Sequence, residues 1–151
     1  MDKRHQSLLT AVFLVAGSGT RISKLTKNPK CLLKIKNKTL IELNIEKLIK
    51  FGVKNFIIVM GFKKKLIIDH IKTLKNEKKI NIKYIDNKSY ISKGNSHSLF
   101  LGLKSMKRGP CIFLDGDIIL HSDILKKFIV FNRKNSALVG KGSIKDIITS
   151  L

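Results

Sequence analysis

The sequence predicts an α/β fold, a three-layer sandwich in which helices cover both faces of a Rossmann-like, mostly parallel sheet. Short apolar runs, typical of strands buried on both faces, alternate along the chain with longer segments of helical periodicity. Strands that alternate with helices of this length are joined by right-handed crossovers and run parallel. No linker or repeat interrupts the alternation, so we expect residues 1–151 to form a single domain.

The first strand is expected at residues 11–15, a continuous apolar run that ends in Ala-Gly-Ser-Gly. A helix should begin after Thr39, because Thr39 and Glu42 have the spacing of a capping box, in which each side chain satisfies a free backbone amide. Gly52 stands where a left-handed residue would end this helix. The later elements alternate in the same way: strands at 56–60, 82–85 and 111–114, and helices at about 63–74, 96–106 and 122–131.

Two loops follow strands that should be neighbours in the sheet. Residues 17–21 follow the first strand, and Asp115-Gly116-Asp117 follows the strand at 111–114. In the usual doubly wound order these two strands lie side by side where the strand order reverses, and ligands bind beyond the carboxyl ends at that point. We therefore expect both loops to face one cleft.

The first loop, Gly-Ser-Gly-Thr-Arg, carries groups that suit a phosphate. Gly17 and Gly19 have no Cβ, so backbone amides can approach a ligand closely, while Thr20 adds a hydroxyl and Arg21 a fork of donors. The order of residues matches neither the dinucleotide fingerprint nor the phosphate loop of nucleoside triphosphatases. On the glycines alone, a tight turn with a surface arginine is the more frequent explanation.

The stretch LVAGSGTR at residues 14–21 is followed by Pro29-Lys30 and by LLKI at 32–35. This two-part pattern resembles the signature of sugar-phosphate and choline-phosphate nucleotidyltransferases. The resemblance implies that Arg21 and Lys30 are catalytic and contact the triphosphate. Val15 departs from the family, which usually has Ala there, and could narrow the pocket beside the base. The nucleotide-binding residues that the resemblance implies are Ala16, Gly17, Ser18, Gly19, Thr20, Arg21, Lys30, Gly94, Asn95 and Ser98.

The segment KGNSHSL at residues 93–99 is similar to the part that reads the base in inositol-phosphate and choline-phosphate cytidylyltransferases. This similarity implies CTP as the preferred nucleotide. The same Asn-Ser-Xaa-Ser stretch equally suits a helix start whose side chains cap the free amides.

Asp117 aligns with the metal-binding aspartate of the resembled family, which implies Mg²⁺ as the cofactor. A carboxylate at a strand end beside a triphosphate suits Mg²⁺, which takes a few hard oxygens and completes its octahedron with phosphates and water. Asp115 has the same chemistry, but Asp-Gly-Asp is also an ordinary turn sequence.

The resemblance implies transfer of a nucleotidyl group, cytidylyl from CTP, to a phosphorylated or phosphonate small-molecule acceptor with release of pyrophosphate. It covers residues 11–131, and members of the family have a longer catalytic region. We therefore expect the acceptor-binding part to be missing after about residue 131, unless a partner chain completes the domain. The alternative is a nucleotide-binding fragment or regulatory module that cannot transfer.

The net charge of +21 raises the further alternative of a basic nucleic-acid-binding protein. It is less favoured, because 27 of the basic residues are dispersed lysines and only four are arginines, the residue type that reads bases. Two cysteines without metal-ligand spacing, Cys31 and Cys111, are expected to be reduced and structural. No apolar run approaches the roughly 18 residues of a membrane span, so a cytoplasmic protein is expected.

Overall fold

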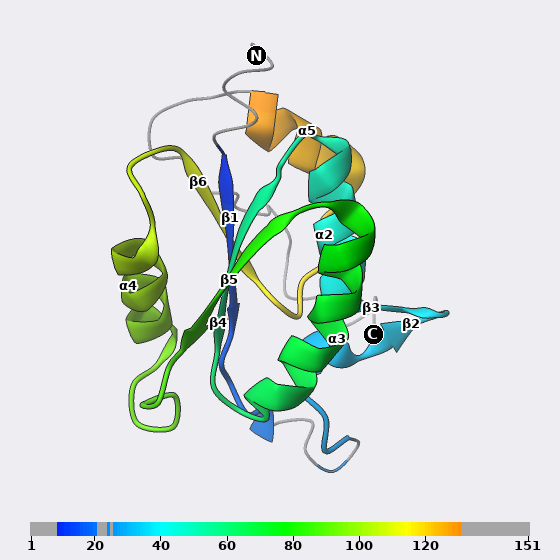
Figure 1. Ribbon diagram of the computed structural model, residues 1–151. Coiled ribbons are helices and arrows are strands. Elements are labelled where there is room, and N and C mark those ends of the chain that lie inside the picture. The colour runs from blue at the N-terminus through cyan, green and yellow to red at the C-terminus, as the bar shows by residue number, and fades with distance from the viewer. Residues whose placement is uncertain (1–8, 21–23, 25, 131–151) are drawn as a thin grey trace, which may run out of the picture. The chain divides into compact units, whose positions relative to one another are not determined.

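A computed structural model describes residues 9–20, 24 and 26–130. By its internal contacts the chain divides into two units, Met1–Leu120 and His121–Leu151. The first unit holds the sheet (Figure 1), and the second contains α5 (Ser122–Val130). Within the described residues, no helix combines the length and apolar character needed to cross a membrane.

The sheet of the first unit has four parallel strands in the order β5-β4-β1-β6. The chain adds strands on one side of β1, then crosses over it to place β6 on the other side, so the strand order reverses between β1 and β6. This order confirms the prediction that the first strand and the strand at 111–114 are adjacent in the sheet. The strands are β1 (Thr10–Val15), β4 (Asn55–Met60), β5 (Asn81–Asp86) and β6 (Cys111–Asp115).

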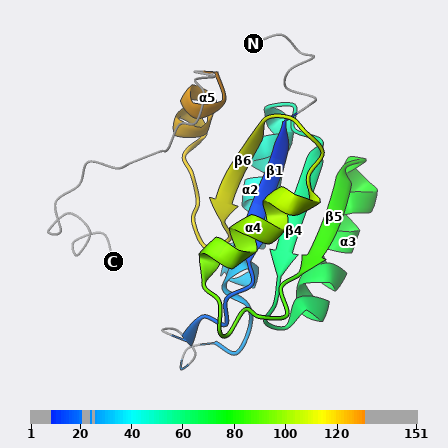
Figure 2. The same cartoon turned by 90° about the vertical axis from the view of Figure 1, so that its left-hand side faces the viewer.

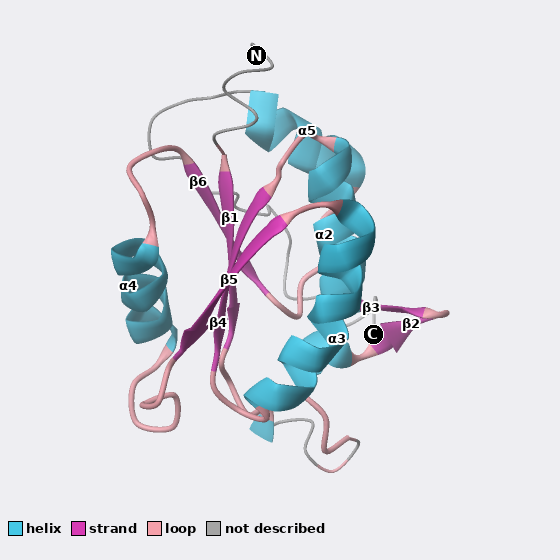
Figure 3. Cartoon of the chain, in the orientation of Figure 1, coloured by secondary structure: helices cyan, strands magenta, loops and turns pink. Residues whose placement is uncertain are grey.

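Three helices cover the two faces of this sheet. Two of them, α2 (Leu40–Lys50) and α3 (Lys64–Lys78), lie on one face, and α4 (Asn95–Ser105) lies on the other (Figures 1 and 2). The colouring by secondary structure in Figure 3 shows the resulting layers of helix, sheet and helix. The predicted α/β sandwich is therefore confirmed, and every predicted strand and helix is present within a few residues of its expected bounds.

The core lies on both faces of β1, where Ala11, Val12 and Phe13 are fully buried. On the α4 side, the added Cβ of an alanine at Gly102 would lie 2.7 Å from Val12 Cγ1, so glycine is what lets the helix approach the sheet so closely. On the opposite face the apolar stripes of α2 and α3 are buried: Ile41, Ile45, Leu48, Ile67 and Ile71.

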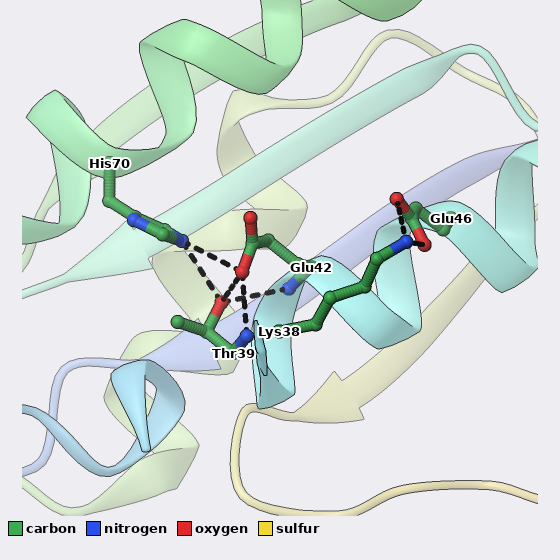
Figure 4. Close-up of polar contacts among 5 residues, drawn as sticks. All are labelled: Lys38, Thr39, Glu42, Glu46 and His70. Atoms are coloured by element: carbon green, nitrogen blue, oxygen red, sulfur yellow. Dashed lines mark hydrogen bonds and ion pairs between the residues drawn. The ribbon is translucent and has the colours of Figure 1, made fainter. Parts of the chain in front are cut away.

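The predicted capping box at the start of α2 is confirmed. Glu42 N donates to Thr39 Oγ1 at 3.3 Å, and Thr39 N donates to Glu42 Oε2 at 2.6 Å. His70 of α3 joins this pair, because its Nε2 lies 3.0 Å from Thr39 Oγ1 and 3.2 Å from Glu42 Oε2 (Figure 4). At the other end of the helix, Gly52 has the predicted left-handed conformation, with φ of 84°.

The structure contains two short elements that the sequence pattern does not predict. A 3₁₀ helix spans Lys30–Leu32, and a small antiparallel hairpin pairs β2 (Lys34–Ile35) with β3 (Lys38–Thr39). Strands of two exposed or polar residues are too short to show a period, and the turn depends on Lys36 at a positive φ of 55°. The helix α3 also runs four residues beyond its predicted end at 74. Residues 75–78 are all polar, so no apolar residue marks a buried face of the helix there.

Candidate functional site

A cavity of about 600 Å³ lies at the carboxyl ends of β1 and β6, where the strand order reverses. Both loops that the sequence places at this edge contribute to it, as expected for a ligand site in an open parallel sheet. The residues that line it are Leu14, Val15, Gly17, Ser18, Gly19, Thr20, Lys30, Cys31, Tyr90, Ile91, Asn95, Asp115, Gly116 and Asp117.

The two glycines of the first loop serve different purposes. A Cβ added at Gly17 would meet no protein atom within 4 Å, so protein packing does not require glycine there, and its surface is open to the cavity. Gly19 has a left-handed φ of 67°, and a Cβ there would lie 3.0 Å from Lys30 Cγ. The aliphatic stem of Lys30 therefore packs over Gly19 and is directed along the loop.

Lys30 and Asp117 form an ion pair inside the cavity. The Lys30 ammonium donates to Asp117 Oδ2 at 3.1 Å, with side chains that are 29% and 43% exposed. The loop that carries Asp117 is held by α2, because the buried Asn44 side chain donates to the carbonyl of Ile118 at 2.6 Å. A cation and a carboxylate are thereby placed beside the glycine loop.

Asp115 lies at the end of β6, two residues before Asp117. Burial, and then the negative charge of Asp117, raise the pKa of the Asp115 carboxyl. A Cβ added at the intervening Gly116 would lie 2.1 Å from Val15 Cγ1, so this glycine is required for close packing against β1. Gly116 and Asp117 do form a turn, as the ordinary turn sequence Asp-Gly-Asp allows, and the site role of Asp115 stays a prediction.

These two carboxylates fit a divalent cation. Two neighbouring acids that repel one another at a polar cavity gain from a cation between or beside them, and Mg²⁺ commonly takes one or two carboxylates, with phosphates and water completing its shell. Among the described residues, no group of three or more His, Cys, Asp and Glu side chains could hold a metal. The donor set thus suits a cation shared with a bound phosphate.

Cys31 also lines the cavity, which the sequence did not indicate. Its thiol is almost fully buried, and burial together with the nearby Asp117 carboxylate raises its pKa to about 12. Both Cys31 and Cys111 are free thiols, in agreement with the expectation of reduced cysteines. A neutral thiol at this place contributes packing below the acid pair.

A second wall of the cavity comes from the loop between β5 and α4. Tyr90 and Ile91 of this loop line the cavity, as does Asn95 at the start of α4, whose Nδ2 donates to Asp115 Oδ1 at 3.3 Å. The Tyr90 ring lies against the backbone of Gly61, where an added Cβ would be 2.6 Å from Tyr90 Cγ. Sequence reasoning missed Tyr90 and Ile91, although an aromatic residue just beyond the predicted strand 82–85 was the available signal.

The structure brings most of the predicted site residues together. The cavity is lined by Gly17, Ser18, Gly19, Thr20, Lys30, Asn95 and Asp117. Arg21, predicted to contact the triphosphate, lies outside the described residues.

Three predicted nucleotide-binding residues do not line the cavity. Ala16 is buried, and its carbonyl accepts a hydrogen bond from Phe62 N at 3.0 Å. Gly94 is the N-cap residue of α4, so the alternative of a helix start in this segment is confirmed, although Gly94 makes no side-chain cap hydrogen bond. Ser98 is buried and accepts a hydrogen bond from Asn87 Nδ2 at 2.9 Å.

Comparison with known proteins gives a matching family model and several similar proteins. The family model described as nucleotidyl transferase matches residues 10–146. The bifunctional protein GlmU of Methanococcus vannielii is 38% identical over 119 residues, which are 78% of this chain and 27% of that protein. The choline-phosphate cytidylyltransferase of Streptococcus pneumoniae is 35% identical over 94 residues, 62% of this chain and 38% of that protein.

Among solved structures, a UDP-glucose pyrophosphorylase complexed with UDP-glucose superposes with a TM-score of 0.68 and 26% identity, covering 82% of this chain and 52% of that one. The chain thus spans between about a quarter and a half of the length of the proteins that it matches. The family model, however, covers nearly all of the chain, including the glycine loop, Lys30 and the acid pair. The chain belongs to the nucleotidyl transferase family.

Proposed function

We propose that this chain binds a nucleoside triphosphate, with CTP preferred, as the nucleotide-binding part of a nucleotidyltransferase. The observation that carries the proposal is the cavity at the carboxyl ends of β1 and β6, where an open glycine loop, a lysine and two carboxylates converge. Membership of the nucleotidyl transferase family supports the same chemistry. The transferred group would go to a phosphorylated or phosphonate small molecule, with release of pyrophosphate.

The chain's own residues supply positioning and charge. Backbone amides of the loop from Gly17 to Thr20 would donate to the phosphates, which can come close because the surface at Gly17 is open. The Lys30 ammonium, directed by its stem over Gly19, would bind the negative charge of the triphosphate. Arg21 follows this loop directly in the sequence and would add a second cation.

Proteins of this family generally depend on a divalent metal, and Mg²⁺ is the ion that we propose here. Asp117, with Asp115 beside it, would hold it, and the ion would neutralise phosphate charge and orient the α-phosphate when bound. Asn95 would keep the Asp115 carboxylate in place through its hydrogen bond. Lys30 would then move from Asp117 to the phosphates. The cation would take the place of the Lys30 ammonium beside Asp117, and the phosphates would take the place of the Asp117 carboxylate beside Lys30.

In the proposed reaction an anionic oxygen of the acceptor attacks the α-phosphorus. A new P–O bond forms as the bond between the α-phosphorus and its bridging oxygen breaks, and pyrophosphate leaves with that oxygen. The attacking oxygen is already ionised, so no general base is needed. The rate enhancement would come from alignment of the two groups and from charge stabilisation around the α-phosphate.

The similar proteins differ in the nucleotide that their names carry. A choline-phosphate cytidylyltransferase supports CTP, whereas the similarity to a UDP-glucose pyrophosphorylase makes UTP the first competitor. Calorimetric titration of the chain with CTP, UTP, ATP and GTP in the presence of Mg²⁺ would decide between them. The proposal expects CTP to bind most tightly, and equal affinity for all four would remove the preference.

Transfer is tested by release of pyrophosphate from CTP with choline phosphate, inositol phosphate, aminoethylphosphonate and sugar 1-phosphates as acceptors. Release that depends on one acceptor supports a complete transferase. Tight CTP binding without release with any acceptor would support the second candidate, a nucleotide-binding module. The partial coverage of the relatives favours testing this candidate, and activity restored by a second polypeptide would indicate a partner chain that completes the domain.

A further inference from the structure

Two buried polar side chains, Asn87 and Ser98, lie behind the second wall of the cavity. Asn87 is fully buried and Ser98 is 2% exposed, and the Asn87 side-chain amide donates to Ser98 Oγ at 2.9 Å. Neither residue lines the cavity. Polar groups so deeply buried are retained where their hydrogen bonds fix a particular arrangement, since desolvating them is costly.

Asn87 connects three segments of the chain. Its backbone amide donates to the carbonyl of Met60 at the end of β4, at 2.7 Å. Its side-chain oxygen accepts from Ser89 N at 3.0 Å, and its carbonyl accepts from Tyr90 N at 3.3 Å. With the bond to Ser98, one residue thus joins β4, the following loop and α4.

The loop held in this way has little apolar packing of its own. Ile91 is 85% exposed, and residues 92–95 are also exposed. Tyr90 is the part of the loop that packs, with its ring against Gly61 and one side toward the cavity. Two restraints therefore place the Tyr90 ring: the contact with Gly61 and the hydrogen bonds that Ser89 N and Tyr90 N donate to Asn87.

Ser98 lies one turn into α4, three residues after Asn95. Asn95 reaches the other wall of the cavity through its bond to Asp115. A hydrogen bond that fixes Ser98 therefore also fixes the helix start from which Asn95 projects. The same buried bond thus restrains Tyr90 through the loop and Asn95 through the helix.

We propose that the buried Asn87–Ser98 hydrogen bond positions the Tyr90 side of the cavity, and that both residues act on a bound nucleotide through this wall without touching it. The effect on nucleotide affinity rests on the function proposed above. The position of the Tyr90 ring does not, because it is a property of the protein without ligand. Asn87 and Ser98 are accordingly positioning residues, and Ser98 is not a nucleotide ligand.

The chain offers a direct probe of this wall. It has two tyrosines and no tryptophan, so a Tyr84→Phe variant leaves Tyr90 as the sole tyrosine fluorophore. In this background Ser98→Ala should raise the rate of acrylamide quenching of Tyr90, because the loop is released. Ser105→Ala is the matched control, since it removes a hydroxyl of the same helix that donates to Gly102 O at 2.8 Å. Quenching in the control should equal that of the Tyr84→Phe parent.

Affinity is measured separately, by calorimetric titration with CTP and Mg²⁺. Ser98→Ala should weaken binding about tenfold, as loss of a buried hydrogen bond would, and Ser105→Ala should leave it unchanged. Ser98→Ala added to Tyr90→Ala should cause a smaller loss than Ser98→Ala alone, because only the part of its effect that passes through Asn95 remains. A second loss of the same size in the double variant would overturn this route.

The two proposals fail in different ways. If acrylamide quenches Tyr90 equally in Ser98→Ala and in its Tyr84→Phe parent, although the wild-type chain binds CTP, the positioning role is overturned and the proposed function stands. If the wild type binds no nucleoside triphosphate although Ser98→Ala exposes Tyr90, the function is overturned and the positioning role is supported. Circular dichroism melts of every variant exclude global unfolding as the source of increased quenching.

Discussion

Lys30 Nζ lies 3.1 Å from Asp117 Oδ2, and the two residues are 87 positions apart in the sequence. The pair joins the segment after the glycine loop to the loop after β6 and lies inside the cavity. Because both side chains are partly exposed to water, the pair contributes little to folding. Its charges are instead available to a ligand that carries the opposite charges, a phosphate for Lys30 and a cation for Asp117.

The first prediction concerns Lys30→Met, which keeps the stem over Gly19 and removes the charge. The free energy of unfolding should change by less than about 0.5 kcal/mol, as for other exposed ion pairs. The Kd for CTP with Mg²⁺ should rise roughly tenfold to a hundredfold, because a charge-assisted contact to phosphate is lost. Urea unfolding and calorimetric titration measure the two quantities.

Lys38→Met is the matched control for this substitution. Lys38 also pairs with a carboxylate, Glu46 Oε2 at 2.6 Å, but it does not line the cavity. Its variant should show a similarly small change in stability and wild-type affinity for CTP. Unchanged affinity in Lys30→Met would remove Lys30 from the nucleotide site.

The second prediction contrasts the two glycines of the loop. Gly17→Ala should leave the free energy of unfolding near the wild-type value, since the new methyl meets no protein atom within 4 Å. It should weaken CTP binding on the order of tenfold or more, because the methyl occupies the open surface that the phosphates need to approach. Titration and urea unfolding of the same samples separate the two effects.

Gly19→Ala should behave differently, because Gly19 has a φ of 67° and packs against Lys30. Placing alanine in this conformation should cost about 1–2 kcal/mol of folding free energy, in addition to any loss of affinity. If Gly17→Ala binds CTP as tightly as wild type, the glycine is not there for a ligand, and the tight-turn explanation of the loop gains support.

The sequence predicted the fold well because its signals are local. The apolar runs around Phe13 and Ile58, the capping box at Thr39 and the glycine at position 52 each act within a few residues. The order of the strands followed from general rules for parallel sheets. The hairpin of β2 and β3 was missed because its strands of two residues carry no period.

The site was predicted in part, for a related reason. The glycine loop, Lys30 and Asp117 belong to a continuous pattern that can be read from the sequence, and they do line one cavity. The hydrogen bond of Ser98 could not be predicted from the sequence, because its partner Asn87 comes from a loop that reaches α4 only in the folded chain. Tyr90 depends likewise on a close approach to Gly61 across neighbouring strands. Such contacts are properties of the tertiary structure.

The third prediction concerns Glu42 and acid. Burial acts to raise the pKa of the Glu42 carboxyl, but hydrogen bonds from the Thr39 amide and hydroxyl, with the charge of His70, outweigh it, and the pKa is lowered from 4.5 (Figure 4). Below pH 4.5 the unfolded chain therefore binds a proton that the folded chain resists. The stabilisation from Glu42 is fully present above this pH and is lost as the pH falls through the folded pKa.

Thermal melts between pH 3 and 7 test this sign. Glu42→Gln should flatten the acid limb of the stability profile, because glutamine can hold the capping box without titrating. Glu46→Gln is the control in the same helix, since its carboxylate pairs with Lys38 instead of the cap. An acid limb that is equally steep in Glu42→Gln and in wild type would contradict the assignment.

The last prediction concerns the thiol beneath the acid pair. A thiol whose pKa is raised from 9.0 to about 12 carries about a thousandfold less thiolate at pH 8, and thiolate is the reactive form. In a Cys111→Ser background, iodoacetamide should therefore modify Cys31 slowly in the folded protein and faster as urea unfolds the chain. The raised pKa of Cys31 also makes the stability of the protein depend on pH. Between pH 9.0 and about 12 the thiol loses its proton in the unfolded chain but keeps it in the folded chain, so the free energy of unfolding falls as the pH rises.

Asp117→Asn tests the electrostatic part of this shift. Its carboxylate raises the pKa of Cys31, so its removal should speed alkylation of the folded protein relative to the Cys111→Ser parent. Asp69→Asn, a carboxylate of α3 outside the cavity, should leave the rate unchanged. Rapid alkylation of Cys31 in the parent, measured by mass spectrometry at pH 8 without urea, would show that the thiol is accessible and ionised. It would then have to be considered a reactive group of the site.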